Sequence, residues 1–197
     1  MNSKTIRTLI IVGVLLIAFL WIKGSYNTLV DNDEKLTTYW NNVEVAYQLR
    51  LDKITQIAET VNAEAKFEKS TLAEITNARA SAGQVKLSTD QLNPENIAKF
   101  EQAQQSAFSR MMIVLERYPD LKSPKGFENL QFEISEVENR INTARTDYNA
   151  AVQKYNLSVR KFPSNLFAGI FGFEKKSGFS ADKTAEKPAN LKKMLSE

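Results

Sequence analysis

Residues 127–162 read FENLQFEISEVENRINTARTDYNAAVQKYNLSVRKF, and their core-type side chains recur every seven residues. One set of positions lies seven apart, and a second set lies between them at spacings of three and four. The first set is Phe127, Ile134, Ile141, Tyr148, Tyr155 and Phe162, and the second is Leu130, Val137, Ala144, Ala151 and Ser158. This spacing puts both sets on one face of an α-helix and is typical of coiled-coil packing. The stretch therefore predicts a long helix whose stripe packs on another helix.

A second heptad pattern covers residues 26–65. Its two sets of positions are Leu29, Leu36, Val43, Arg50 and Ile57, and Trp40, Tyr47, Ile54 and Val61. Between this pattern and the apolar run of residues 9–22 before it, only Gly24 and Ser25 are helix breakers, and both are weak. We therefore expect one rod that passes from the apolar run into the heptads.

Two shorter helices are predicted between the long ones, over residues 70–85 and 94–118. Asn93 is a good N-cap before Pro94 at the first helical position, and Pro119 disfavours helical conformation in the residue before it. No useful stretch alternates with a period of two, so no strand is predicted. The chain is expected to be all-α, an elongated antiparallel helical bundle of three to four long helices with an N-terminal transmembrane helix.

The apolar run near the N-terminus, residues 9–22, reads LIIVGVLLIAFLWI. Its eleven Leu, Ile, Val and Phe side chains favour membrane insertion by about 3–7 kcal/mol. A cleavable signal peptide is the alternative, but no A-x-A-like site follows the run. We expect a retained single-pass anchor (residues 1–24) in the cell membrane, with residues 6–22 in lipid. Lys4 and Arg7 on the N-terminal flank favour an outer, periplasmic position for the rest of the chain.

Composition excludes several kinds of chemistry. The chain has no Cys and no His, so it offers no thiol nucleophile, no disulfide and no zinc site of the Cys/His type. Lys4, Arg7 and Lys23 account for the net charge of +3, because the other residues hold 26 − 3 = 23 basic and 23 acidic side chains. A nucleic-acid partner is therefore not expected.

Tyr-Asn pairs recur after the apolar run and twice in the last predicted helix. The stretches are Tyr26-Asn27-Thr28-Leu29-Val30, Asp147-Tyr148-Asn149-Ala150-Ala151-Val152 and Lys154-Tyr155-Asn156-Leu157-Ser158-Val159. With Glu116-Arg117-Tyr118-Pro119-Asp120-Leu121-Lys122 and Phe162-Pro163-Ser164-Asn165, they make roughly residues 20–173 similar to the LemA family. The resemblance implies a membrane-anchored bacterial helical bundle, in a family without an established enzymatic activity.

One local signature departs from that family. Where such proteins usually show two adjacent Arg before the acidic residue, this chain reads Leu49-Arg50-Leu51-Asp52, and Thr55-Gln56 replaces the usual Pro-Asn. A family-specific contact at this place would therefore be altered in this chain.

A polar register network inside the bundle is the first candidate site. Its members are Tyr26, Asn27, Arg50, Tyr148, Asn149, Tyr155 and Asn156. Tyr hydroxyls and Asn amides at core positions fix helix register or bind a ligand, and we favour register and packing because Tyr buries its ring readily. Arg50, at a core position, is expected to snorkel or to meet a carboxylate such as one on the last helix.

Acidic residues of the last predicted helix are candidate metal ligands. Glu133, Glu136 and Glu138 lie close in sequence, but di-metal helical bundles also use His. We therefore expect no metal, and no catalytic or cofactor-binding residue is predicted because the sequence shows no triad and no phosphate-binding loop.

A Phe-rich segment is the second candidate site, as an interface or a membrane contact. Its large apolar side chains are Leu166, Phe167, Ile170, Phe171 and Phe173. An exposed patch of this kind marks a contact with lipid or with another subunit, and the alternative is that it folds back on the bundle. Residues 174–197 are typical of a mobile polar tail, which leaves residues 25–173 as the bundle domain.

Together these features predict a non-enzymatic scaffold or interaction protein of the bacterial cell envelope. We expect it to form a homo-oligomer or to bind an envelope protein, without a cofactor or a small-molecule substrate. The alternative is a membrane-shaping protein that inserts residues 166–173 into lipid.

Overall fold

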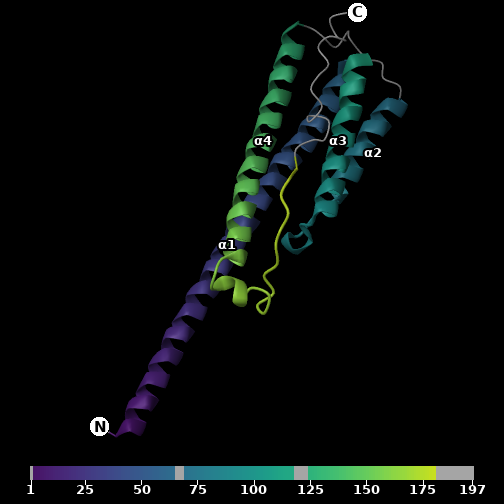
Figure 1. The fold of residues 1–197 in the computed structure, drawn as a ribbon. Coiled ribbons are helices and arrows are strands. Elements are labelled where there is room, and N and C mark those ends of the chain that lie inside the picture. The colour runs from purple at the N-terminus through teal and green to yellow at the C-terminus, as the bar shows by residue number, and fades with distance from the viewer. Residues whose placement is uncertain (1, 65–68, 118–123, 181–197) are drawn as a thin grey trace, which may run out of the picture.

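The computed structural model describes residues 2–64, 69–117 and 124–180, which form helices and loops without a strand (Figure 1). The helices are α1 (Ser3–Glu64), α2 (Lys69–Gln84), α3 (Pro94–Arg117) and α4 (Pro124–Arg160), with the 3-10 helices η1 (Thr89–Gln91) and η3 (Ser164–Leu166). Four long helices pack together, and the first carries a long apolar stretch. The predicted fold class is therefore confirmed.

Helix α1 is one rod of 62 residues, roughly 90 Å long. Gly24 does not break it, because one Gly costs only about 1 kcal/mol and Thr28 Oγ1 donates to the carbonyl of Gly24 at 2.9 Å. The side chains from Leu9 to Leu20 are exposed, with Leu20 62% exposed, whereas Leu29 is fully buried. The free part makes α1 the one helix in the described ranges that is long and apolar enough to cross a membrane.

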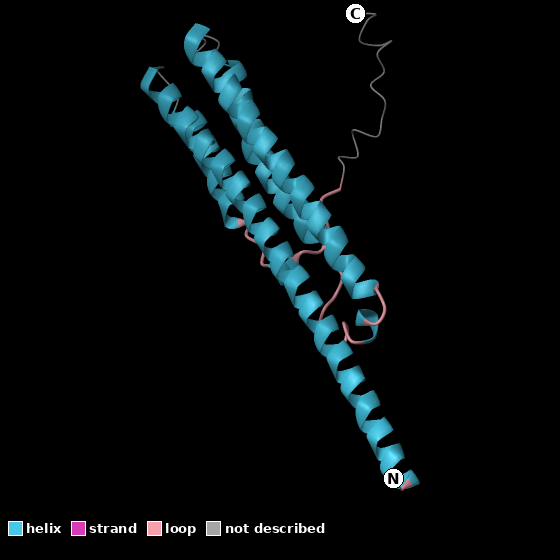
Figure 2. Ribbon diagram, turned by 90° about the vertical axis from the view of Figure 1, so that its left-hand side faces the viewer, coloured by secondary structure: helices cyan, strands magenta, loops and turns pink. Residues whose placement is uncertain are grey.

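The bundle consists of two antiparallel helix pairs. Helix α1 runs beside α4, and α2 runs beside α3, as Figures 1 and 2 show. Helix α1 also contacts α2 and α3, so it lies at the centre of the arrangement. Its N-terminal part projects beyond the other helices at the end of the bundle where α4 ends (Figure 1).

Two clusters of buried side chains form the core, and both heptad patterns supply them. The larger cluster includes Leu36, Trp40, Val43, Tyr47, Phe100, Ile141, Tyr148, Val152 and Tyr155. The smaller cluster consists of Leu51, Ile54, Ile75, Ala82, Ala107 and Met111. Four positions of the predicted stripes lie outside the residues whose side chains the structure describes, namely Ile57, Val61, Phe127 and Leu130. The packing of the α1 stripe on the α4 stripe is confirmed for the others up to residue 158.

Helix α3 begins as predicted. Pro94 is its first residue, and the N–H of Asn96 donates to Asn93 Oδ1 at 2.9 Å. This bond satisfies one of the amides that a helix leaves unpaired in its first turn. The predicted break at Tyr118-Pro119 lies outside the described residues.

Helix α4 ends at Arg160, before the last predicted heptad position. Phe162 was expected on the buried stripe but is 68% exposed, so this part of the prediction is wrong. The physical reason is Pro163, which disfavours the helical conformation in the residue before it. The stripe therefore stops one position early, at Ser158, and the chain turns into η3.

The chain after η3 returns along the bundle instead of leaving it. Residues 174–180 are drawn out beside α4 without helical turns (yellow in Figure 1), and Phe179 is only 7% exposed. These seven residues differ from the mobile tail expected there. The remainder of the predicted tail, residues 181–197, lies outside the described residues.

Candidate functional site

Two asparagine side chains of α4 hold the backbone of the returning chain. Asn156 Nδ2 donates to the carbonyl of Lys176 at 2.8 Å, and the N–H of Lys176 donates to Asn156 Oδ1 at 2.9 Å. Asn149 makes the same pair of bonds with Phe179, at 3.1 and 2.8 Å. A side-chain amide that donates and accepts in this way replaces a backbone partner. We name Asn149 and Asn156 the asparagine clasp, and residues 174–180 the clasped segment.

The peptide between the two clasp positions is also held, from two sides. Tyr148 Oη donates to the carbonyl of Ser177 at 2.8 Å. The N–H of Ser177 donates to the carbonyl of Leu92, in the loop before α3, at 3.2 Å. The clasped segment therefore bridges α4 and the α2–α3 connection.

Phe179 anchors the clasped segment in a box of aromatic and cationic side chains. Its ring stacks on Trp40 with centroids 6.0 Å apart, and Tyr148 meets it edge-on at 5.6 Å. The guanidinium carbon of Arg145 lies 4.7 Å from the centre of the same ring, while Arg145 pairs with Glu101 of α3 at 2.6 Å. One ring thus joins α1 and α4, and through Arg145 it is linked to α3.

The clasped segment has no room for a side chain at residue 178. A Cβ added to Gly178 would lie 2.5 Å from Asn149 Oδ1 and 3.2 Å from Asn149 Cγ. The clasp therefore selects glycine directly before the aromatic residue.

Burial changes the acidity of the two tyrosines on the α4 stripe. Removal from water disfavours the phenolate, so the pKa of Tyr155 rises to about 12, helped by the nearby charges of Asp33 and Glu174. Burial likewise raises the pKa of Tyr148. Tyr148 therefore stays a hydrogen-bond donor for Ser177 over the whole physiological pH range.

Arg50 meets a carboxylate of α4, one of the two outcomes expected for it. The residue is 6% exposed, and its Nη2 forms an ion pair with Glu138. The rings of Tyr47 and Phe108 lie 5.1 and 4.9 Å from its guanidinium carbon. Beside this pair lies a cavity of about 470 Å³, lined mainly by polar side chains of α1, α3 and α4. The charge is thus compensated inside the bundle, as burial requires.

The acidic residues weighed as metal ligands each pair with a different cation. Glu133 meets Lys53 at 3.0 Å, Glu136 meets Arg140 at 2.6 Å, and Glu138 meets Arg50. Within the described parts of the chain, no group of three or more His, Cys, Asp or Glu side chains is placed to hold a metal ion.

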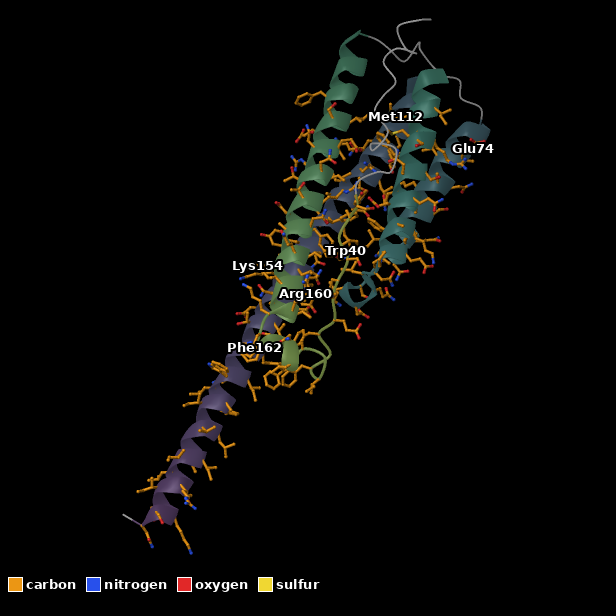
Figure 3. All side chains as sticks on the ribbon, in the orientation of Figure 1. Trp40, Glu74, Met112, Lys154, Arg160 and Phe162 are labelled. Carbon is orange, nitrogen blue, oxygen red and sulfur yellow. The ribbon has the colours of Figure 1, made fainter. Side chains whose placement is uncertain are left out.

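The Phe-rich segment lies at the base of the bundle, where the free part of α1 begins. Phe162 meets Trp21 edge-on with ring centroids 6.2 Å apart, and Tyr26 meets Phe171 at 5.1 Å. Figure 3 labels Phe162 at this end, beside the projecting part of α1. The segment is thus held to α1 by aromatic contacts on both sides of Gly24.

Only part of the Phe-rich segment is covered by the bundle. Phe173 packs on the larger core cluster, and Ala168 is 2% exposed. Leu166, Ile170 and Phe171 are 56%, 78% and 42% exposed. Part of the segment thus folds back on α1, and the rest presents an exposed apolar patch; contact of that patch with lipid or another subunit stays a prediction.

The seven residues of the predicted polar network lie in three places. Tyr26 is at the base with the exposed Asn27, and Arg50 is beside Glu138. On α4, Asn149, Asn156 and the hydroxyl of Tyr148 bind the clasped segment. The rings of Tyr148 and Tyr155 are buried in the core, and that of Tyr148 meets Trp40 of α1 at 5.3 Å. Sequence reasoning missed Lys176, Gly178 and Phe179, because a short polar stretch with one Phe carries no periodic signal.

Comparison with known protein families decides the identity of the bundle. The family model of the LemA family matches residues 39–192, most of the chain. The chain belongs to the LemA family. The matched range includes the asparagine clasp, the clasped segment and the Arg50–Glu138 pair.

Individual relatives are more distant. Magnetosome protein MamQ 2 of Paramagnetospirillum magneticum is 39% identical over 84 residues, 43% of this chain and 29% of the relative. Magnetosome protein MamQ of Magnetospirillum gryphiswaldense is 31% identical over the same length. Protein LemA of Metamycoplasma hominis is 23% identical over 145 residues, 74% of this chain and 64% of the relative. The match of this chain to the MamQ proteins thus spans less than a third of their length.

Proposed function

We propose that this LemA protein is a non-enzymatic scaffold of the bacterial cell envelope, anchored in the cell membrane by α1. Its bundle stands on the outer, periplasmic face and associates with further copies or with an envelope protein. The proposal includes no catalysis, no cofactor and no small-molecule substrate.

One observation carries the proposal, namely the change of environment along a single helix. The side chains from Leu9 to Leu20 have no protein around them, and the described apolar stretch is not buried at all. From Leu29 onward the same rod is the centre of the bundle core. Free apolar surface of this extent is unfavourable in water and favourable in lipid. This change of environment supports a membrane anchor that holds the bundle directly at the membrane surface.

The anchor is tested by charged substitutions in cells. Leu15→Arg with Leu16→Arg should move the protein out of the membrane fraction, because each Arg at mid-span costs about 2.5–3.5 kcal/mol. Val45→Arg is the matched control, since Val45 is 68% exposed on the bundle part of α1. A double Arg variant that still resists alkaline extraction would contradict the anchor.

Orientation and association are tested with one reporter, because the chain has no Cys of its own. Asn41→Cys puts a thiol on an exposed position of α1. In intact cells it should react with a maleimide that cannot cross membranes. Crosslinking in native membranes should capture dimers or a partner, and monomers alone under several crosslinker chemistries would contradict the scaffold.

A second candidate function, membrane shaping, is supported by the position of the Phe-rich segment relative to the expected membrane span. A hydrocarbon core of about 30 Å takes about 20 helical residues, so a span that begins at Ile6 ends near Tyr26. Tyr26 is the residue against which Phe171 packs. The exposed Leu166 and Ile170 would then meet the bilayer surface, where apolar side chains insert and bend a membrane.

Lipid contact is tested in proteoliposomes with the whole chain. A fluorophore on Ile170→Cys should be quenched by spin-labelled lipid, and one on Phe132→Cys, 70% exposed toward the other end of α4, should not. Ile170→Asp with Phe171→Asp should abolish any vesicle deformation seen by electron microscopy. Unchanged deformation in that variant would eliminate the membrane-shaping function.

A further inference from the structure

The distance between Asn149 and Asn156 along α4 matches the distance between two peptide units of an extended chain. Asn149 and Asn156 are seven residues apart, which is about 10.5 Å along a helix. Their partners Phe179 and Lys176 are three residues apart, which is about 10 Å along an extended chain. Two amides at this spacing therefore bind two peptide units of one extended strand, running antiparallel to α4.

Most of this recognition is independent of sequence. The clasp, Tyr148 and the Leu92 carbonyl bind only backbone atoms of residues 176, 177 and 179. Only two adjacent positions select particular residues. Gly178 leaves room for the side chain of Asn149, and the ring of Phe179 stacks on Trp40. We name the surface formed by the asparagine clasp, Tyr148 and Trp40 the groove; it fits an extended peptide that carries Gly-Phe at the positions of residues 178 and 179.

We propose that this groove is a peptide-binding site that joins two copies of the protein by exchange of their clasped segments. The proposal names a mechanism for the self-association proposed above and depends on it. Every copy carries the peptide that fits, so a segment from a neighbour makes the same contacts as its own.

The membrane favours exchange between copies for two geometric reasons. Copies anchored by identical α1 helices hold their grooves at the same height, and confinement raises their effective concentration. Residues 161–173 connect α4 to the clasped segment. Exchange requires their aromatic contacts with α1 to open, and the freed connection spans roughly 40 Å when fully extended. Neighbouring bundles two helices thick have centres only about 20 Å apart.

Complementation between two defective full-length chains tests the proposal. The groove variant, Asn149→Asp with Asn156→Asp, removes the amide donors but keeps an intact segment. The segment variant, Phe179→Ala, keeps an intact groove. The two carry different affinity tags and are reconstituted alone or together in proteoliposomes of phosphatidylethanolamine and phosphatidylglycerol, then captured by crosslinking. Together they should give about tenfold more dimer than either gives alone.

Three controls keep the outcomes separate. Circular dichroism should show unchanged helix content in both variants, and Gly178→Val replaces Phe179→Ala as the segment variant if the latter is not folded. If the mixed variants dimerise no better than each alone while the unaltered protein still dimerises, exchange is refuted and self-association uses another surface. If the unaltered protein gives only monomers, both exchange and the proposed self-association fail.

Discussion

The ring of Phe179 stacks on the indole of Trp40, with centroids 6.0 Å apart and planes 17° from parallel. Trp40 is 1% exposed, and its Nε1 donates to the carbonyl of Leu87 at 2.9 Å. The centre of α1 is therefore covered by the loop after α2 and by the clasped segment. Because Phe179 closes this box, the segment is part of the core and not an appendage to it.

Phe179→Ala should release the clasped segment while the helices stay folded. Loss of a buried Phe costs about 3 kcal/mol, here mostly as local opening. The N–H groups of Ser177 and Phe179 donate to Leu92 and Asn149, so their hydrogen exchange should become roughly a hundredfold faster. Phe132→Ala is the matched control, because Phe132 is 70% exposed on α4. Equal exchange in both variants would mean that Phe179 does not hold the segment.

Removal of one partner of the Arg50–Glu138 pair should lower the free energy of unfolding more than replacement of both partners by apolar residues. Glu138→Ala leaves a guanidinium buried without its partner, so the free energy of unfolding should fall by about 2–3 kcal/mol. Arg50→Met combined with Glu138→Leu should recover most of that loss, since it removes both charges. Denaturant unfolding in a double-mutant cycle measures the coupling.

The exposed pair Arg140–Glu136 provides the control for that cycle. Its side chains are 61% and 49% exposed and lie one turn apart on α4. Coupling there should be about 0.3–0.5 kcal/mol, as for other surface pairs in helices. A coupling as large as that of Arg50 and Glu138 would contradict the role of burial.

Periodic features of this fold could be predicted from the sequence, because they follow from local rules. The α1 and α4 stripes repeat over many turns, so spacing alone assigned Leu36, Val43, Ile141 and Tyr155 to the core. The partner type of Arg50 followed from the cost of a buried charge. Phe162 was misplaced because the heptad was extended up to the residue directly before Pro163, where a local steric rule overrides the pattern.

The clasp could not be predicted, because it is made by a contact that leaves no pattern in sequence. Its two asparagines look like polar residues beside a core stripe, and their partners are backbone groups that every residue carries. Residues 174–180 contain one large apolar residue, Phe179, so their composition favours a polar tail. The spacing of seven helical residues against three extended ones becomes visible only when both segments are seen together.

Stability should fall at alkaline pH through the buried tyrosines. The phenol of Tyr155 keeps its proton to about pH 12 in the folded protein, whereas an ordinary phenol loses it near pH 10. Above pH 10 the unfolded state therefore binds fewer protons than the folded state. The stabilising effect is complete below pH 10 and is lost progressively between pH 10 and 12.

The measurement is the free energy of unfolding against pH for wild type and Tyr155→Phe. The variant should lose less stability between pH 10 and 12, because one titrating group is gone. Tyr39→Phe is the control, since Tyr39 is 37% exposed on α1. Identical slopes for wild type and Tyr155→Phe would show that this phenol ionises freely in the folded state.

Gly178→Ala should weaken the clasp through a single methyl group. The new Cβ would lie 2.5 Å from Asn149 Oδ1, so the amide must turn away and give up its two bonds to Phe179. Each bond contributes about 0.5–1.5 kcal/mol, which predicts a loss of about 1–3 kcal/mol in local stability. Gly169→Ala is the matched control, because a Cβ there meets nothing within 4 Å. Amide exchange at Phe179 should rise in Gly178→Ala and stay at the wild-type rate in Gly169→Ala; similar rates in both would show that Asn149 adapts without releasing the segment.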